Sequence, residues 1–278
     1  MLGQLGENAK FLAGGQSLIP LLKLRFANPE HLVDLNFIPA TSFITEGSGR
    51  LRFGAMTRHA EIEHSALAKK IPVVHDCAAG IADVQVRNRG TIGGSLAEAD
   101  PSGDWANALI TLDATVHCLG TSGVRAIQLA DFIKDAYTTA LAHDELVTEV
   151  EVKIPPHGSG GAYLAFKRTA PVYPSASAAV QLTLAGDVCQ DVAIALGCVG
   201  LTPIRATEAE KVLRGKSLND KTIATAAEAA RAAADPQTDM RGSAEYKRQL
   251  VVALVKRAIQ IAARRARGEQ VEGTHLYA

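Results

Sequence analysis

Two short segments of the chain each pair two glycines and follow them closely with a serine. They are Ala13-Gly14-Gly15-Gln16-Ser17 and Thr91-Ile92-Gly93-Gly94-Ser95. Glycine permits positive φ and close approach of a ligand to the backbone. Backbone N–H groups, a hydroxyl and a helix N-terminus together suit a phosphate group. Either segment alone is more often a tight turn without a ligand, but the two together predict one pyrophosphate held from two sides.

The motifs that the sequence lacks narrow the type of nucleotide. There is no GxxxxGK[ST] segment and no GxGxxG turn with a later acid, which argues against a P-loop and against a Rossmann dinucleotide site. The second glycine segment runs into a polar loop that carries Glu98, Asp100 and Asp104. A carboxylate in this loop can accept hydrogen bonds from ribityl or ribose hydroxyls. Capping of the next helix by Ser102 or Asp104 is the simpler interpretation.

Composition limits the classes of partner. The 278 residues carry 29 basic and 29 acidic side chains, so the electrostatic footprint of a nucleic-acid binder is missing. The basic stretch Lys256–Arg267 is interpreted as a solvated helix face. No stretch is long and apolar enough to span a bilayer, and Met1–Lys10 lacks the apolar core of a signal peptide. The sequence therefore predicts a cytoplasmic protein with no nucleic-acid partner and no membrane span.

Neither metal chemistry nor general-base catalysis is predicted. No CxxC pair and no Cys/His set with metal-ligand spacing occurs, so the chain cannot hold an iron–sulfur cluster alone. His59, His64 and His75 show no pairing with a hydroxyl or thiol and are interpreted as core or surface residues. No catalytic residue is assigned. The scattered cysteines are Cys77, Cys118, Cys189 and Cys198.

In the first half, hydrophobic patterns predict short strands that alternate with helices. The segment Pro155–Gly161 is rich in proline and glycine. It is expected to break helix and sheet, and it places a domain boundary between residues 1–156 and 157–278. The predicted strands cover residues 10–13, 31–35, 51–55, 115–119, 124–129 and 146–154, and the predicted helices cover 18–26, 59–70 and 71–82.

In the second half, strands are followed by helices, which indicates an α+β domain with a three-stranded antiparallel sheet. Gly186-Asp187 predicts a hairpin turn. Ser243 is a good N-cap for the last helix, and Pro236 ends the helix before it. The predicted strands cover residues 162–167, 176–185 and 188–199, and the predicted helices cover 206–213, 221–234 and 244–266.

With these motifs in the same order, the chain resembles the FAD-binding medium subunit of molybdenum hydroxylases, the family of carbon monoxide dehydrogenase and xanthine dehydrogenase. The two glycine segments match that family's two FAD pyrophosphate motifs, and the resemblance covers nearly the whole chain. Further matching segments are Gln85–Gly90, Tyr137–Leu141 with Glu145-Leu146, Thr202–Ala206 and Arg241–Tyr246.

The resemblance implies an α+β fold: a two-subdomain α/β FAD-binding domain of vanillyl-alcohol-oxidase (PCMH) type, then an α+β C-terminal domain. It implies that Asp104 contacts FAD, that Ile81 packs on the isoalloxazine, and that Lys167 lies on the flavin side. The loop after Lys167 is expected to carry Tyr173 to the edge of the ring. The cofactor-binding residues so expected are Leu12, Ala13, Gly14, Gly15, Gln16, Ser17, Leu18, Ile81, Thr91, Ile92, Gly93, Gly94, Ser95, Asp104, Leu146, Val147, Lys167 and Tyr173.

The resemblance also implies a function within a complex. A large subunit would oxidise the substrate at molybdenum, and a small subunit with two [2Fe–2S] clusters would relay electrons to FAD on this chain. An external acceptor, such as NAD, a quinone or oxygen, would receive them. A dimer of heterotrimers is the expected assembly.

The chain departs from the family pattern at two places, and two other functions stay open. The family has about two dozen residues before the first glycine strand, where this chain has only Met1–Asn8. Pro171-Val172-Tyr173-Pro174 replaces a loop that often carries an aspartate, so the role of that aspartate is not carried over. The alternatives are a standalone flavin oxidoreductase of vanillyl-alcohol-oxidase type and a non-catalytic nucleotide-binding assembly module.

Overall fold

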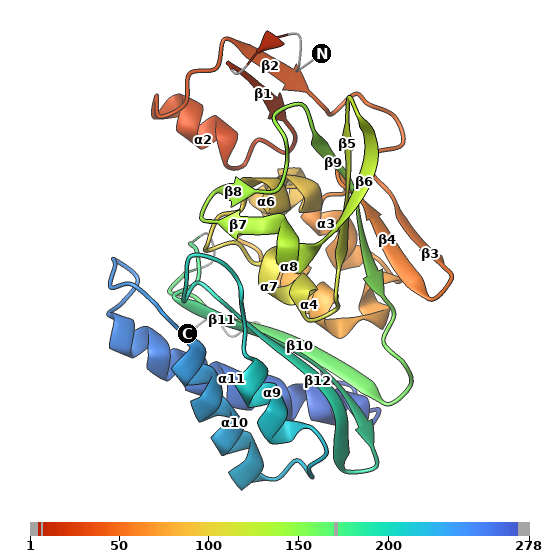
Figure 1. The fold of residues 1–278 in the computed structure, drawn as a ribbon, viewed down its shortest axis with the longest axis vertical. Coiled ribbons are helices and arrows are strands. Elements are labelled where there is room, and N and C mark those ends of the chain that lie inside the picture. Colours follow the sequence, from red (N-terminus) through yellow and green to blue (C-terminus); the bar gives the residue numbers. More distant parts are fainter. Residues whose placement is uncertain (1–4, 7, 170–171, 272–278) are drawn as a thin grey trace.

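The first glycine segment joins a strand to a helix, as the sequence predicts. The computed structural model describes residues 5–6, 8–169 and 172–271. In the N-terminal layer, β1 (Ala9–Leu12) pairs in parallel with β2 (His31–Asp34), and α2 (Leu18–Lys23) connects them. This small layer lies at the top of Figure 1. The short segment Met1–Asn8, which the sequence analysis noted before the first glycine strand, lies largely outside the described residues.

The middle of the molecule holds a larger antiparallel sheet with helices beside it (Figure 1). Within the described residues its five strands have the order β3-β4-β9-β5-β6. The strands are β3 (Ile44–Gly47), β4 (Arg50–Gly54), β5 (Thr115–Gly120), β6 (Gly123–Gln128) and β9 (Leu146–Lys153); a separate hairpin pairs β7 (Ile133–Asp135) with β8 (Thr138–Thr139). The helices are α3 (His59–His64), the 3₁₀ helix η1 (Ala68–Lys70), α4 (Pro72–Gly80), α5 (Val84–Arg89), α6 (Ile92–Glu98), α7 (Trp105–Ile110) and α8 (Leu129–Phe132).

The helix predicted over residues 59–70 is interrupted at Ser65. The backbone of Ser65 is extended, with ψ of 126°, and its hydroxyl accepts a hydrogen bond from the N–H of Leu67 at 3.2 Å. A serine side chain that bonds nearby backbone groups competes with helical hydrogen bonds. The segment therefore divides into α3 and η1.

The C-terminal sheet contains the three long antiparallel strands that the sequence predicts. The hairpin turn at Gly186 is also confirmed, with φ of +59°. A two-residue strand, which the sequence analysis missed, pairs with Ala195 and Leu196 at the edge. The strands are β10 (Ser159–Phe166), β11 (Ala176–Ala185), β12 (Val188–Gly197) and β13 (Ile204–Arg205), and the helices are α9 (Thr207–Leu213), α10 (Asp220–Ala233) and α11 (Ala244–Ala266).

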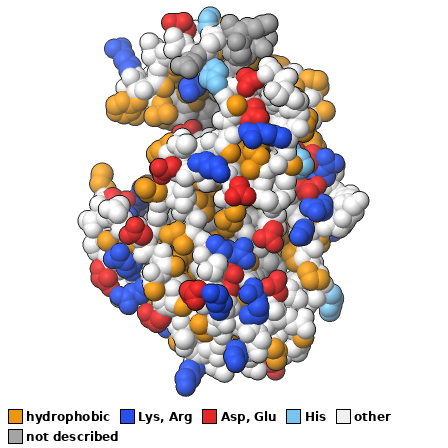
Figure 2. Space-filling model, viewed as in Figure 1, with side chains coloured by type: hydrophobic (Ala, Val, Ile, Leu, Met, Phe, Trp, Pro, Cys, Tyr) orange, Lys and Arg blue, Asp and Glu red, His pale blue; other side chains and the backbone are white. Residues whose placement is uncertain are grey.

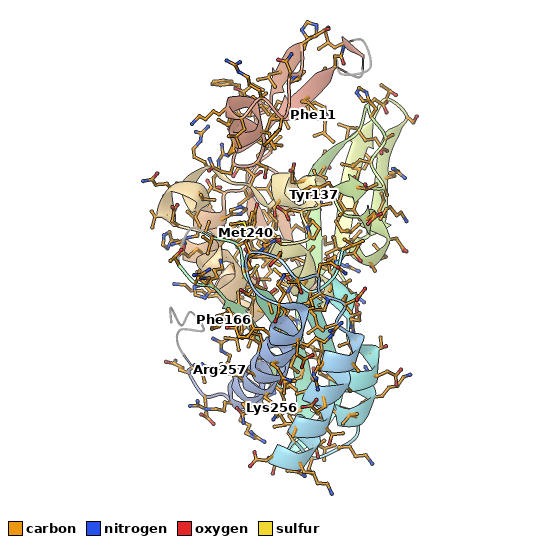
Figure 3. The ribbon with its side chains drawn as sticks, turned by 90° about the vertical axis from the view of Figure 1, so that its left-hand side faces the viewer. Phe11, Tyr137, Phe166, Met240, Lys256 and Arg257 are labelled. Atoms are coloured by element: carbon orange, nitrogen blue, oxygen red, sulfur yellow. The ribbon has the colours of Figure 1, made fainter. Side chains whose placement is uncertain are left out.

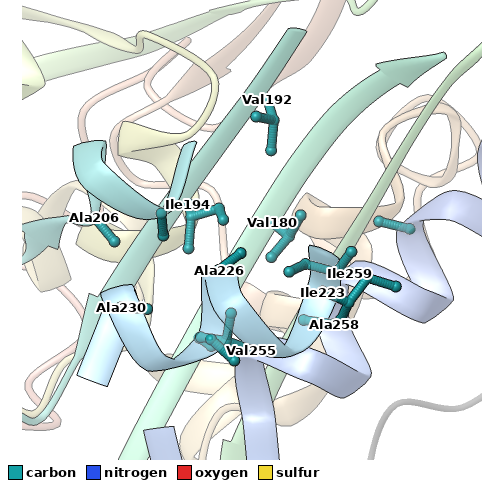
Figure 4. Packing of buried hydrophobic residues seen from close by; sticks show 14 of the residues in the cluster. Val180, Val192, Ile194, Ala206, Ile223, Ala226, Ala230, Val255, Ala258 and Ile259 are labelled. Atoms are coloured by element: carbon teal, nitrogen blue, oxygen red, sulfur yellow. The ribbon is translucent and has the colours of Figure 1, made fainter. Parts of the chain in front are cut away.

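The C-terminal sheet is covered on both faces. Helix α11 packs against β10 and β11 on one face, while α4 and α7 from the middle of the chain pack on the other. Figure 4 shows Val180 of the sheet near Ile259 of α11, with Ile194 on the side of Ala206 and Ala226 in the same hydrophobic cluster. Burial on both faces explains why residues 176–182 of β11 are all buried instead of alternating between core and solvent.

The glycines before this sheet do not break it, contrary to the sequence interpretation. Gly160 and Gly161 lie inside β10, which begins at Ser159. A Cβ atom on Gly160 would come within 2.0 Å of the carbonyl oxygen of Ala262 in α11. Glycine therefore lets the last helix cross this strand at close range.

Exposed apolar side chains gather on the N-terminal layer. Figure 2 shows hydrophobic side chains along the lower edge of this layer. Near α2, Leu24 is 65% exposed and Phe26 is 80% exposed, and no residue of α2 is buried. Among the described residues, none of the helices combines the length and apolar character that crossing a membrane requires.

Candidate functional site

A cavity of about 560 Å³ is lined by residues of the N-terminal layer and of the middle of the molecule, together with Lys167, Val172 and Tyr173 from the segment after β10. Its volume is in the range typical of small-molecule sites. The walls come from β1 and the first glycine segment, from α6 with the loop after it, from the end of α4, from the start of β9, and from the residues after β10. In Figure 3, Phe11 of the cavity wall lies in the upper layer, above Tyr137 in the middle of the molecule.

The two glycine segments meet in this cavity. A Cβ atom on Gly14 would lie 2.2 Å from the carbonyl oxygen of Arg89 and 2.8 Å from the Cα of Gly90. The first turn therefore rests directly on the backbone that leads into the second. A Cβ on Gly93 would lie 2.5 Å from the Cβ of Ala55. Close packing of backbone segments is the reason for glycine at these positions.

Positive φ is a smaller part of the explanation than the sequence suggests. Of the four paired glycines, only Gly15 has a positive φ, of +74°. Gly93 and Gly94 lie in the first turn of α6, after Thr91 as N-cap. Positive φ therefore accounts for Gly15 alone among the four, and the second pair lies in a helix.

The two turns differ in the backbone N–H groups that they offer. The N–H groups of Ile92, Gly93 and Gly94 donate to Thr57 O, Ala55 O and Thr91 Oγ1 at 3.1, 2.9 and 3.2 Å. In the first turn, by contrast, no acceptor within the described part of the chain takes the N–H groups of Gly15, Gln16 and Ser17. Successive N–H groups around a left-handed residue form a concavity that binds anions. Of the two turns, the first is therefore the one whose backbone N–H groups are available to bind an anion.

Asp104 reaches the cavity wall from the start of α7. Its carboxylate does not cap this helix, so the simple capping interpretation is wrong for Asp104. Instead it accepts a hydrogen bond from the hydroxyl of Tyr163. Asp104 is 6% exposed and Tyr163 is fully buried. Burial, followed by the negative charge of Asp104, holds the pKa of Tyr163 well above its usual value, so the phenol stays a neutral donor.

Lys167 and Ile81 meet at the C-terminal end of α4. The ammonium of Lys167 donates to the carbonyl oxygen of Gly80, the last residue of that helix. A cation there is favoured by the helix dipole. Ile81 follows as the C-cap, and both side chains line the cavity. At the end of α4, the cavity wall therefore presents the apolar side chain of Ile81 beside the buried ammonium of Lys167.

Tyr173 lies at the cavity mouth, beside groups from other segments. The guanidinium of Arg241 lies 5.9 Å from the centre of its ring. Burial is the main cause of a raised pKa of Tyr173, and the charge and hydrogen bond of Asp100 add to it. In the same loop, Ala170 and Pro171 fall outside the described residues.

The expected residues come together in the cavity, with two exceptions. Leu12 is not part of the wall, and Ile92 is buried in the core beneath α6. Leu146 and Val147 line it at the start of β9. The other expected residues that line it are Ala13, Gly14, Gly15, Gln16, Ser17, Leu18, Ile81, Thr91, Gly93, Gly94, Ser95, Asp104, Lys167 and Tyr173.

The cavity wall also holds polar residues that the sequence analysis did not assign to the cofactor. His59 accepts a hydrogen bond from Trp105 Nε1 at 3.0 Å, and burial together with Arg58 and Arg87 lowers its pKa to about 3. It is a neutral core histidine, as interpreted, that also borders the cavity. Nothing in its local sequence marks it, because Trp105 lies 46 residues away. The charged and histidine side chains of the wall without an assigned role are Lys10, His59, Glu98, Asp100, His143 and Glu145.

Among the described residues, one group of side chains outside the cavity lies close enough together to hold a metal ion, namely His117, Glu149 and Glu151. Both carboxylates already form ion pairs, Glu149 with Arg52 at 2.6 Å and Glu151 with Arg50 at 2.7 Å. These arginines neutralise the charge that would attract a cation, so the group is best described as a network of ion pairs on the sheet.

Comparison with known proteins identifies both halves of the chain. Residues 1–156 match the family described as the FAD binding domain in molybdopterin dehydrogenase, and residues 161–262 match the CO dehydrogenase flavoprotein C-terminal domain. The carbon monoxide dehydrogenase medium chain of Afipia carboxidovorans is 41% identical over 96% of this chain and 93% of its own length. The glyceraldehyde dehydrogenase medium chain of Sulfolobus acidocaldarius is 37% identical over 91% of this chain and 90% of its own.

Solved structures of similar proteins have the same fold as this chain. Reconstituted CO dehydrogenase from Oligotropha carboxidovorans superposes with a TM-score of 0.92 at 40% identity, covering 95% of this chain and 93% of that chain. Quinoline 2-oxidoreductase from Pseudomonas putida 86 superposes with a TM-score of 0.90 at 35% identity, covering 95% of this chain and 92% of that chain. The α+β fold class is thereby confirmed, and FAD is the cofactor. The chain belongs to the FAD-binding medium subunits of the molybdenum hydroxylases, which are parts of multi-subunit dehydrogenases.

Proposed function

We propose that this chain binds FAD across its two glycine turns and is the electron-transfer subunit of a molybdenum hydroxylase. Bound FAD would take electrons from [2Fe–2S] clusters of a small partner subunit and pass them to an external acceptor such as NAD, a quinone or oxygen. The observation that supports this most is the cavity, which both turns line at close range to each other. The N–H groups of Gly15, Gln16 and Ser17 have no acceptor among the described residues.

The residues present fit such a cofactor. The N–H groups of the first turn would donate to the pyrophosphate, and Thr91 and Ser95 would offer hydroxyls from the other side. Asp104 would accept from hydroxyl groups of the cofactor. Ile81, Leu146 and Val147 would pack on its apolar ring system, and Lys167 would supply positive charge. The protein thus supplies placement and electrostatics, while the redox chemistry belongs to the cofactor.

The proposed partner subunits would supply the iron–sulfur clusters for which this chain has no ligands. In the described residues, and in the sequence, nothing resembles a cluster of thiolates that could hold iron and sulfur, since its four cysteines are free and scattered. We propose a small [2Fe–2S] subunit and a large molybdenum subunit as partners, in a dimer of heterotrimers. Free thiols are typical of a reducing compartment, which supports a cytoplasmic location. The proposed domains are residues 1–156 and 157–278.

Purification of the native complex tests the partners. We expect this chain to co-purify with a large molybdenum-containing polypeptide and a small polypeptide that carries two [2Fe–2S] clusters. Mass spectrometry of the polypeptides and metal analysis give the answer. A fully active preparation that contains this polypeptide alone would support a standalone flavin oxidoreductase instead. A colourless preparation without nucleotide would support an assembly module.

The cofactor is expected to be non-covalent FAD at about one per chain. The cavity wall would hold the pyrophosphate through hydrogen bonds, its described residues include no cysteine, and burial raises the pKa of Tyr173, so this phenol is not an activated nucleophile. Acid or heat should therefore release all the flavin, which chromatography and mass spectrometry identify. Release of FMN, or flavin that remains on the denatured chain, contradicts the prediction.

Replacement of Tyr173 by alanine is expected to change the rate at which external acceptors are reduced. Tyr173 is 48% exposed at the cavity mouth, where an acceptor must approach. FAD content and reduction of the clusters by substrate should stay the same. Tyr246→Ala, a change at a tyrosine that is 44% exposed and outside the cavity wall, is the control. If every acceptor is reduced at the wild-type rate, Tyr173 has no part in electron delivery.

A further inference from the structure

The hydrogen bond between Tyr163 and Asp104 joins two domains at the cavity. Asp104 begins α7 in the FAD-binding half, and Tyr163 lies in β10, the first strand of the C-terminal sheet. The two residues are 59 positions apart in the chain. Tyr163 is 0% exposed and packs in the hydrophobic core of the FAD-binding half, beside residues of α4 and α7. A side chain of one domain is thus built into the other.

Tyr163 is held on its backbone side as well. Its N–H donates to Asp76 Oδ2 at 3.3 Å, and Arg265 of α11 donates to the same oxygen at 2.5 Å. Arg265 also donates to the carbonyl oxygen of Gly161 at 2.7 Å. The strand is therefore fixed to α4 and α11 at the level of this residue. With its backbone fixed and its ring buried, the phenol has little freedom to leave Asp104.

From this arrangement we infer that Tyr163 is a positioning residue for FAD binding: it holds the carboxylate of Asp104 in its place at the cavity wall. The inference rests on the proposed role of Asp104 as a cofactor contact. A buried carboxylate must be hydrogen-bonded to remain charged. A rigid donor fixes the direction of this carboxylate and favours its charged form, which is the better acceptor for a hydroxyl of the cofactor. The C-terminal domain thereby sets a contact that the FAD-binding domain cannot set alone.

Tyr163→Phe is the direct test, because it removes one oxygen and keeps the ring. In the full chain, we expect the FAD dissociation constant at neutral pH to rise about tenfold, the loss typical for a hydrogen bond to a charged group. Tyr246→Phe removes a hydroxyl from a half-exposed tyrosine outside the cavity wall, and it should bind FAD like the wild type.

A pH profile separates positioning from general loosening of the fold. Without the phenol, Asp104 is expected to take up a proton at a higher pH than in the wild type. As the pH is lowered, the FAD affinity of Tyr163→Phe should therefore begin to decrease at a higher pH than the affinity of the wild type. The affinity of Asp104→Asn, which lacks the titrating carboxylate, should not show this decrease. Ionisable groups whose charge couples to Asp104 include Tyr163 on β10, Cys77 on α4, Cys198 after β12 and Tyr173 after β10; Lys167 acts on Cys77 from the same region.

A double-mutant cycle completes the test. Tyr163→Phe together with Asp104→Asn removes the buried negative charge as well as the hydroxyl that donates to it, so this variant is expected to fold even if the single phenylalanine variant does not. Its FAD affinity should equal that of Asp104→Asn alone. If the double variant loses FAD affinity by the product of the two single losses, the residues act independently and the inference is wrong. It is also wrong if Tyr163→Phe binds FAD like the wild type at all pH values. If Asp104→Asn itself binds FAD like the wild type, the proposed contact of Asp104 is wrong, which is a different failure.

Discussion

Replacing Gly14 with valine is expected to abolish FAD loading. Even the first added atom, a Cβ, would lie 2.2 Å from the carbonyl oxygen of Arg89, and the obstacle is backbone that cannot rotate away. The first turn would have to move from the second, and its free N–H groups would lose their place opposite Thr91 and Ser95. Flavin per chain after gel filtration measures the effect.

Gly94→Val is expected to give the same loss for a different local reason. A Cβ on Gly94 would lie 2.7 Å from Thr91 Oγ1, the oxygen that caps the first turn of α6. Loss of an N-cap costs about 1 kcal/mol, and the turn that borders the cavity would be displaced. If only one of the two variants loses FAD, the turns do not share one pyrophosphate.

Gly47→Ala serves as the control for both glycine variants. No atom lies within 4 Å of the Cβ position of Gly47, and its φ is not positive. This variant should bind FAD and unfold like the wild type. Unfolding of each variant without FAD shows whether the chain still folds. Full FAD loading of Gly14→Val would contradict the idea that the two turns are held together by close backbone contact.

Replacing Arg265 with methionine is expected to lower the free energy of unfolding by about 3–5 kcal/mol, the usual cost of removing one partner from a buried ion pair. Arg265 of α11 donates to Asp76 of α4 at 2.5 and 3.2 Å. The two side chains are only 10% and 4% exposed. The change would leave the carboxylate of Asp76 buried without its cation. Urea unfolding of the full chain measures the effect.

The adjacent Arg264 provides a matched control. It pairs with Glu269 at 2.7 Å, but both side chains are about half exposed, so Arg264→Met should cost less than about 1 kcal/mol. Adding Asp76→Leu to Arg265→Met removes the buried charge and should recover much of the lost stability. Equal effects of the Arg264 and Arg265 variants would show that the pair between α4 and α11 does not hold the two domains together.

Local patterns in the sequence determined many of the elements and the position of the two glycine turns, although they missed β13 and the break at Ser65. The caps at Ser243 and the hairpin at Gly186 are set by neighbouring residues, so α11 and the β11–β12 pair could be predicted closely. The glycine segments and the polar loop after them also led to the cavity wall. Each of these features rests on residue types within a few positions of one another.

Tertiary structure alone decided which groups these elements present. Asp104 pairs with Tyr163 and not with its own helix, and Lys167 reaches the end of α4, because strands and helices far apart in the chain pack together. The N–H groups of the second turn are occupied by Ala55 and Thr57, so only the first turn keeps donors for a ligand. Hydrogen bonds between distant segments leave no periodic or local trace in a sequence, and for this reason the fold had to show them.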